Sequence, residues 1–156
     1  GILGHFLSGE RVNLVNGVVL ARERGIDVVT TMRSERGVYT DLVELTVKTD
    51  ASARSVAGTF VRPGEPRIVR IDAYDVDAHP DGHMLIFTNE DQPGMIGKIG
   101  TLLGNYNVNI AGMQLGRLKK NDRAVAILNL DDPIPDEVME EIRSLPNIFD
   151  ANLVQI

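Results

Sequence analysis

The most regular pattern of hydrophobic and polar positions lies between residues 83 and 156. Apolar runs with strand character are separated there by two stretches whose apolar residues recur at helical spacing. The predicted elements, in order, are a strand at 84–88, a helix at 93–106, strands at 107–117 and 123–131, a helix at 135–145 and a strand at 148–156. This β-α-β-β-α-β order predicts a ferredoxin-like domain.

The preceding residues show a less regular pattern. "RVNLVNGVVLARERG" has apolar residues at helical spacing, with Asn13 or Asn16 as a candidate cap and Gly25 as a stop. Residues 26–34 and 38–50 are rich in Val, Ile, Thr and Tyr and are predicted to form a hairpin. Short strands are also predicted in "ARSVAGTFVR", "RIVRIDAY" and "DVDAH", with a turn at "PGEP". This half is therefore predicted to be mixed and mainly antiparallel.

The two patterns meet at "HPDGH", residues 79–83, where Pro80 and Gly82 interrupt any regular element. We therefore predict an α+β protein with an intermediate domain at 1–82 and the ferredoxin-like domain at 83–156. The chain opens within an apolar pattern, "GILGHFL". We accordingly expect a piece of a longer protein, with the first domain truncated at its N-terminus.

Composition narrows the classes of function. Hydrophobic residues make up 43% of the 156 residues, and the mean hydropathy is near zero, as in a globular protein. No apolar run approaches the roughly 20 residues that span a bilayer, so no membrane contact is expected. The net charge of −6 argues against a nucleic-acid partner, because phosphate binding relies on clustered Lys and Arg. The absence of cysteine rules out a thiolate nucleophile or metal site and agrees with a cytoplasmic location.

Glycines recur after the first strand of the second domain, in "NEDQPGMIGKIGTLLGNYNVNI". Their spacing fits neither the G-x-G-x-x-G fingerprint of a dinucleotide site nor a P-loop. The apolar residues between them have helical spacing, and each glycine within a helix costs roughly 1 kcal/mol relative to alanine. We interpret Gly97, Gly100 and Gly104 as positions where this helix packs closely on its sheet or on a neighbouring element.

The start of the same helix has the chemistry of an anion site. Pro93 suits the first turn, Asp91 or Gln92 is a candidate cap, and Gly94 leaves the first N–H groups unshielded. Free N–H groups at the positive end of the helix dipole favour a carboxylate. Asp91 and the amide oxygens of Asn89 and Asn109 would accept hydrogen bonds from an ammonium group, if the second strand begins near this turn. Together these groups suit a zwitterion; the alternative is that Asp91 is only a cap and Asn109 only a strand-entry residue.

At these residues the sequence resembles a known family. "NEDQPGMIGKIGTLLGNYNVNIAGMQLGR" is similar to the ACT domain, an amino-acid-binding regulatory module, through its D-x-P-G after the first strand and its "VNI". "VNLVNGVVLARERGIDVV", "YTDLVEL" and "VAGTFVRPGEPRIVRIDAYDVDAHPDGHML" resemble the intermediate, allosteric substrate-binding domain of type 1 D-3-phosphoglycerate dehydrogenases. The resemblance covers nearly the whole chain and implies a regulatory, non-catalytic region.

The resemblance implies a ligand and a partner. ACT domains of this family pair side by side in a homodimer or tetramer, and bind L-serine or another small amino acid at the interface for feedback inhibition of serine biosynthesis. By this resemblance Asp91 takes the amino group, Asn109 reaches across the interface, and backbone N–H groups near Met95 and Ile96 hold the carboxylate. The implied site comprises Asn89, Asp91, Pro93, Gly94, Met95, Ile96, Asn109 and Ile110. Asn89 stands where the family often has His or Tyr. No cofactor is implied for these residues, whereas the parent enzyme would use NAD.

In the intermediate domain, the resemblance implies a second anion pocket, for a phosphorylated effector, at Arg67 and His79. His79 falls where some members carry an arginine. Arg70, three residues along the same strand as Arg67, is predicted to point to the opposite face. The alternative for Arg62, Arg67 and Arg70 is a solvated strand face.

Other functions find less support. The regulatory portion of an iron–sulfur serine dehydratase carries similar domains, and a dimerisation module without ligand is a further alternative. Metal binding by His79, Asp81 and His83 is disfavoured, because Pro80 and Gly82 preclude helical ligand spacing. The first loop lacks the arginine cradle of an acylphosphatase-like hydrolase, and the central strands lack the aromatic residues of an RNA-binding sheet. No nucleophile and base are paired, so no catalytic residue is assigned.

Overall fold

The computed structural model describes residues 13, 16–32, 38–120 and 122–156. The chain divides into two compact units, Gly1–Gly37 and Val38–Ile156, each with its own internal contacts. No helix in the described part of the chain is long and apolar enough to cross a bilayer.

The first unit contains α2 (Gly17–Glu23), the helix that the sequence predicts here. Asn16 occupies the N-cap position, but its side-chain oxygen accepts a hydrogen bond from the backbone N–H of Asn13 at 2.8 Å. The side chain of Asn13 accepts one from the backbone of Asn16 at 3.0 Å, so the two residues close a turn ahead of the helix. Gly25 ends the helix with a φ of +74°, the left-handed conformation common at helix C-termini.

The hairpin predicted for residues 26–34 and 38–50 is wrong. Residues 26–32 form no strand, and the expected turn lies outside the described residues. Within the second unit, β1 (Leu42–Lys48) pairs with β2 (Ala53–Arg62), the next strand along the chain. A β-rich composition therefore did not suffice to make residues 26–32 a strand, because strand formation also depends on a partner for its hydrogen bonds.

The second unit begins with an antiparallel sheet in the order β1-β2-β3-β4, in which β3 spans Glu65–Ile71 and β4 spans Tyr74–Ala78. Gly64, with a φ of +81°, forms the turn predicted at "PGEP". The register of β3 shifts between Ile68 and Arg70 against both neighbouring strands. Such a bulge inserts an unpaired residue and breaks the alternation of side chains between the two faces.

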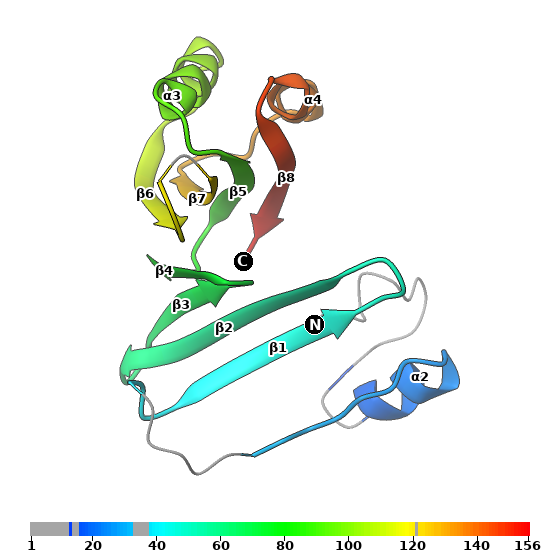
Figure 1. Ribbon diagram of the computed structural model, residues 1–156. Coiled ribbons are helices and arrows are strands. Elements are labelled where there is room, and N and C mark those ends of the chain that lie inside the picture. The colour runs from blue at the N-terminus through cyan, green and yellow to red at the C-terminus, as the bar shows by residue number, and fades with distance from the viewer. Residues whose placement is uncertain (1–12, 14–15, 33–37, 121) are drawn as a thin grey trace. The chain divides into compact units, whose positions relative to one another are not determined.

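The remainder of this unit is the predicted β-α-β-β-α-β domain (Figure 1). Its elements are β5 (His83–Glu90), α3 (Met95–Asn105), β6 (Ile110–Arg117), β7 (Arg123–Leu130), α4 (Asp136–Ser144) and β8 (Ile148–Gln155). The strands form an antiparallel sheet in the order β6-β7-β5-β8. The predicted α+β class and ferredoxin-like topology are therefore confirmed.

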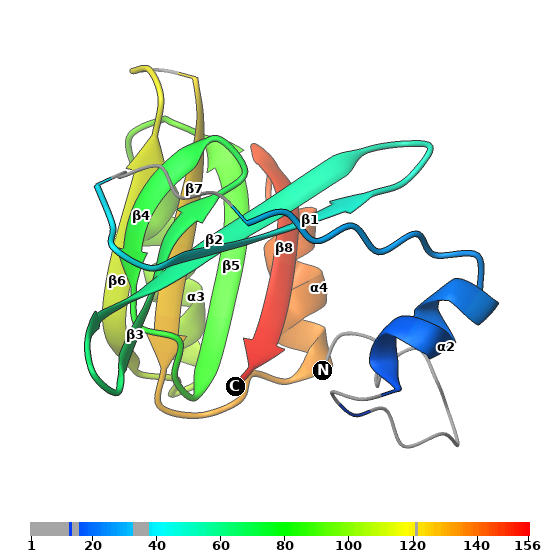
Figure 2. The same cartoon turned by 90° about the horizontal axis from the view of Figure 1, so that it is seen from below.

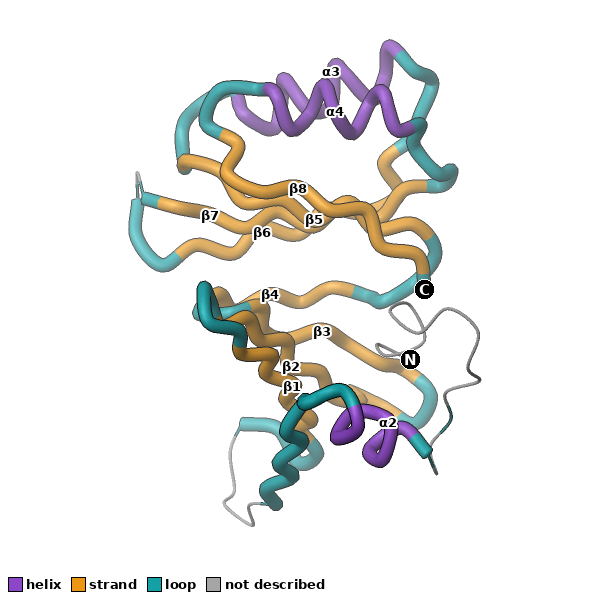
Figure 3. Tube along the Cα trace, turned by 90° about the vertical axis from the view of Figure 1, so that its right-hand side faces the viewer, coloured by secondary structure: helices purple, strands orange, loops and turns teal. Residues whose placement is uncertain are grey.

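Both helices of this domain cover one face of the sheet (Figure 3). The core between them includes Leu85 and Phe87 of β5, Ile99 and Leu103 of α3, and Ile142 of α4, each at most 1% exposed. These residues are the apolar stripes that predicted the elements. Because they are fully buried, they fix where the ends of β5 and α3 lie.

The α3 glycines do not mark close packing within this chain. A Cβ atom added at Gly97, Gly100 or Gly104 would meet nothing within 4 Å. The interpretation of these residues as close-packing positions is therefore wrong, because the buried stripe of α3 is made by its large apolar side chains. The glycines lie on the other faces of the helix.

The opposite face of the same sheet is covered by the first sheet. Ile71 and Ala78 pack with Met84 of β5 and Ile127 of β7 in a second buried cluster. β4 also runs close to β6 (Figure 2). The approach is closest at Gly116, where an added Cβ would lie 2.8 Å from the carbonyl oxygen of Asp75.

Candidate amino-acid site at the start of helix α3

The loop from β5 to α3 leaves the first turn of the helix without a side-chain cap. Gly94 is the N-cap, with a φ of +90° that an L side chain would rarely adopt, and it has no side chain with which to cap the turn. Pro93 precedes the cap, and the helix begins at Met95. The N-cap position is therefore Gly94 and not Asp91 or Gln92, the two residues predicted for it. The N–H of Met95 donates to the carbonyl of Gln92 at 3.5 Å, and the positive end of the helix dipole favours an anion at this turn.

Asn89 is the buried polar residue of this site. Its exposure is 4%, and its amide nitrogen donates to the carbonyl of Glu90 at 2.6 Å. Its Oδ1 atom is buried and has no hydrogen-bond partner. Leu85 and Phe87, four and two residues earlier on the strand, lie in the core under the helices, so alternation directs Asn89 toward the same layer. This orphaned acceptor is suited to an N–H group supplied by a ligand.

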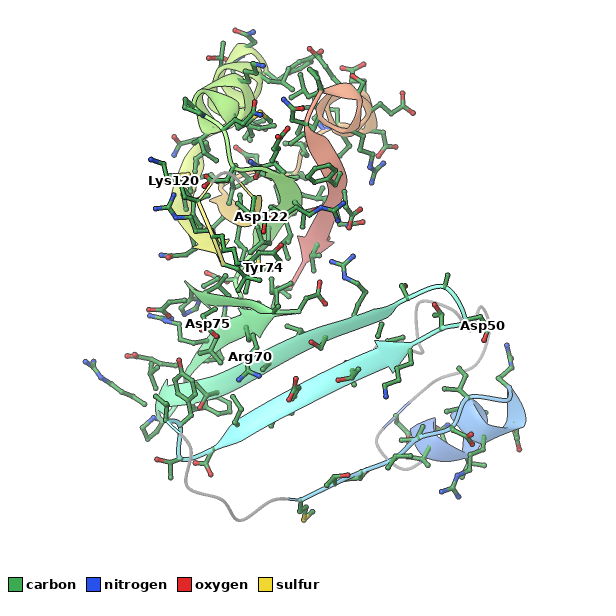
Figure 4. All side chains as sticks on the ribbon, in the orientation of Figure 1. Asp50, Arg70, Tyr74, Asp75, Lys120 and Asp122 are labelled. Carbon is green, nitrogen blue, oxygen red and sulfur yellow. The ribbon has the colours of Figure 1, made fainter. Side chains whose placement is uncertain are left out.

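Asp91 is held by the hairpin that joins β6 and β7. Its backbone N–H donates to the carbonyl of Asp122 at 2.6 Å, and its Oδ2 lies 3.2 Å from Nη1 of Arg117. Figure 4 labels Lys120 and Asp122 on this hairpin. Arg117 was not among the predicted site residues, because its contact with Asp91 depends on the hairpin returning to the end of β5. The one sequence signal is a basic residue at the predicted end of the second strand.

Asn109 lies at the other end of the sheet. Ile110, next to it, is in register with Leu130 of β7, which is paired with His83 at the start of β5. Arg117, which contacts Asp91, is seven residues further along β6, or roughly 23 Å at about 3.3 Å per residue. The expectation that the second strand begins near the Asp91 turn is therefore wrong within one chain.

The surroundings of Asn109 are polar. Its amide nitrogen donates to Oδ2 of Asp131 at 2.7 Å, and its carbonyl oxygen accepts from the backbone N–H of Asp131 at 3.2 Å. The side-chain hydrogen bond orients the Asn109 amide so that its Oδ1 can accept a hydrogen bond from another group. Ile110 packs against the core beneath the helices. One chain thus brings together Asn89, Asp91 and the start of α3, but not Asn109 or Ile110.

A groove of about 480 Å³ runs between α3 and α4, and its walls include Lys98, Thr101 and Glu141. None of the predicted ligand residues lines it. This groove is therefore distinct from the candidate site at the β5–α3 loop.

At the second predicted pocket, formed by Arg67 and His79, the positive charge of Arg67 is balanced by a carboxylate. Nε of Arg67 lies 3.3 Å from the Asp77 carboxylate, and Arg67 neighbours Ile68, which pairs with Ala78 next to His79. The two predicted residues are thus close along the β3–β4 ladder, although the positive charge of Arg67 is already paired.

Arg70 differs from its prediction. Its Nε lies 3.8 Å from the Asp75 carboxylate, and both residues are labelled in Figure 4. The bulge between Ile68 and Arg70 breaks the alternation on which the opposite-face prediction relied. Arg67 and Arg70 each pair with a carboxylate of β4, so the prediction that they diverge does not hold. Among the described residues, no group of three or more side chains is arranged to hold a metal ion.

Comparison with known proteins agrees with this architecture. Residues 1–72 match the D-3-phosphoglycerate dehydrogenase intervening domain, and residues 83–147 match the ACT domain. The protein is therefore a two-part regulatory region, in which an intervening domain precedes an ACT domain.

Several relatives match all or nearly all of the chain. D-3-phosphoglycerate dehydrogenase of Synechocystis is 40% identical over 156 residues, which are 100% of this chain and 28% of that protein. The enzyme of that name from Archaeoglobus fulgidus is 39% identical over 158 aligned positions, covering 100% of this chain and 30% of that protein. D-3-phosphoglycerate dehydrogenase of Methanocaldococcus jannaschii is 37% identical over 145 residues, which cover 93% of this chain and 27% of that protein. The chain belongs to the D-3-phosphoglycerate dehydrogenase family and corresponds to its C-terminal regulatory region. It spans less than a third of the length of these relatives.

Proposed function

We propose that this regulatory region binds L-serine, or another small amino acid, between the ACT domains of two copies of the chain. In the parent enzyme, an NAD-dependent dehydrogenase of serine biosynthesis in the cytoplasm, binding would inhibit the first step of the pathway. A phosphorylated effector near Arg67 and His79 is a secondary proposal, weakened by the pairing of Arg67 with Asp77.

The chemistry of the β5–α3 loop supports a zwitterionic ligand. Uncapped N–H groups at the start of α3 suit the ligand's carboxylate. The carboxylate of Asp91 and the orphaned Oδ1 of Asn89 suit its ammonium group. The buried and unpartnered Oδ1 of Asn89 is the observation that carries the proposal, because a native protein seldom leaves such an atom without a partner.

The separation of Asp91 and Asn109 supports a site built by two chains. An amino acid cannot bridge roughly 23 Å, the length of seven strand residues. Antiparallel pairing of β6 with the β6 of a second copy would bring the start of one strand beside the end of the other. Asn109 of one chain would then face Asp91 of its partner, and the dimer would contain two equivalent sites.

The two edges of the sheet differ in a way that favours β6 as the paired edge. Met113 and Leu115 of β6 are 44% and 52% exposed, and the strand carries no charge before Arg117. An uncharged edge strand with exposed apolar side chains is suited to pairing with another strand. On the other edge, β8 carries Asp150, which lies 3.2 Å from Arg54 of β2. That contact would compete with a partner along β8.

Titration calorimetry with L-serine, with light scattering for the oligomeric state, tests the proposal. We expect saturable binding to a dimer and no comparable binding of D-serine. Replacing Asp91 by Asn removes a charge-assisted hydrogen bond worth about 1.5–3 kcal/mol, which weakens binding roughly 10- to 150-fold. Asp50→Asn, at an exposed turn between β1 and β2, is the matched control and is expected to bind normally. Equal binding by the two variants would refute the role of Asp91.

A second candidate is a dimerisation module that binds no ligand. It is favoured by the ion pair that Asp91 already makes with Arg117. A well-folded dimer that gives no heat with any small amino acid would support this candidate over serine sensing.

A further inference from the structure

Arg117 occupies the position at which the proposed ligand's ammonium group would bind. It lies at the end of β6, opposite Ala124 of β7, which is itself opposite Asn89 of β5. The guanidinium therefore reaches across the end of the sheet to the β5–α3 loop, where its Nη1 lies 3.2 Å from Oδ2 of Asp91. The Asp91 side chain is 26% exposed, whereas that of Arg117 is 60% exposed.

We propose that Arg117 is a specificity-determining residue of the amino-acid site, holding the Asp91 carboxylate until a ligand's ammonium group displaces it. This inference rests on the proposed function. It names the ligand class as α-amino acids, because a cation can replace the guanidinium at the carboxylate. A hydroxyl group in the same position, as in an α-hydroxy acid, carries no charge and competes poorly.

The geometry suits an exchange of partners. Arg117 lies at the end of β6, and its side chain is 60% exposed in one chain, so the guanidinium can move away from Asp91 without opening the core. Asp91 is fixed by its backbone hydrogen bond to Asp122 and stays in place. Exposed ion pairs are weak, so the guanidinium would lower ligand affinity by up to about fivefold without closing the site.

The test compares Arg117→Gln with Arg123→Gln by calorimetric titration with L-serine. Arg123 is a matched control because it lies at the same end of the sheet, where its guanidinium is 4.3 Å from the centre of the Phe149 ring. Both variants remove one positive charge. We expect Arg117→Gln to bind L-serine up to about fivefold more tightly than the wild type, and Arg123→Gln to stay within about twofold.

A second ligand distinguishes displacement of Arg117 by an ammonium group from a general effect of the substitution on the site. In L-glycerate a hydroxyl replaces the ammonium group of serine, and Arg117→Gln should bind it no more tightly than the wild type does. Thermal unfolding followed by circular dichroism establishes that the variants are folded. Affinity for L-serine that is unchanged or weaker in Arg117→Gln overturns the inference while leaving the proposed site intact.

Binding by Arg117→Gln but not by the wild type would also support the inference, since removal of the competitor would have opened the site. No binding by the wild type or either variant would overturn both the inference and the amino-acid site.

Discussion

Replacing Asn89 by leucine is expected to stabilise the unliganded chain and to abolish amino-acid binding. Asn89 is 4% exposed, and its Oδ1 is buried without a partner, a state that costs about 1–3 kcal/mol. Leucine removes that cost and adds about 1.5–3 kcal/mol of apolar burial beneath the helices. The variant loses the hydrogen bond to the Glu90 carbonyl, worth about 1 kcal/mol. The net change is an increase of at least about 1 kcal/mol in the free energy of unfolding.

Urea denaturation monitored by circular dichroism, at one protein concentration, measures this change. Asn129→Leu is the matched control, because Nδ2 of Asn129 donates to the carbonyls of His79 and Asp81 at 3.0 and 3.2 Å. Losing those two hydrogen bonds costs about 1 kcal/mol each, so Asn129→Leu is expected to destabilise the chain. If Asn89→Leu is destabilised as much as Asn129→Leu, the Asn89 amide is satisfied in solution and the reasoning fails.

Two further predictions concern other parts of the second unit. Gly116→Ala is expected to destabilise the chain by about 1–3 kcal/mol, because the new Cβ would press on the backbone of Asp75 at 2.8 Å. Gly104→Ala, in open space on α3, should instead stabilise the chain by up to about 1 kcal/mol. Thermal unfolding measures both variants, and unfolding temperatures that shift in the same direction would contradict the prediction. The pKa of Tyr106 is raised by desolvation and by nearby carboxylates, including Glu141, which its hydroxyl meets at 3.5 Å. Its contribution to stability is therefore present below the tyrosine pKa of the unfolded chain and is lost as pH rises through the higher folded value. Absorbance titration, with Tyr106→Phe to identify the signal, should show that pKa falling in Glu141→Gln, and an unchanged value would exclude the carboxylate as a cause.

The elements of the second domain could be predicted from sequence because each has one strongly periodic apolar face. Leu85 and Phe87 on β5, and Ile99 and Leu103 on α3, mark faces that are fully buried in the structure. Residues 26–32 have the composition of a strand but no strand structure, and composition does not reveal whether a partner is present.

The arrangement of the site was harder to predict from sequence, because it depends on which elements come together in space. Asp91 and Asn109 are near in sequence, yet α3 carries the chain to the other end of the sheet between them. Arg117 is more distant in sequence but meets Asp91 through the β6–β7 hairpin. The β3 residues between Ile68 and Arg70 include no glycine or proline, and the one at this bulge, Gly58, lies on the neighbouring strand β2. The direction of the Arg70 side chain was therefore predicted wrongly.

The second buried cluster has a consequence for dividing this protein. Met84 and Ile127 belong to the ACT sheet, but the side chains that shield them, Ile71 and Ala78, precede residue 83. A chain shortened to residues 83–156 would keep all four ACT strands and both helices while exposing that apolar face to water. We expect such a piece to self-associate through the uncovered face, and sedimentation of the short and full chains at equal concentration would measure it. The two sequence families therefore meet inside one shared core, and a cut between them would separate residues that need each other for solubility.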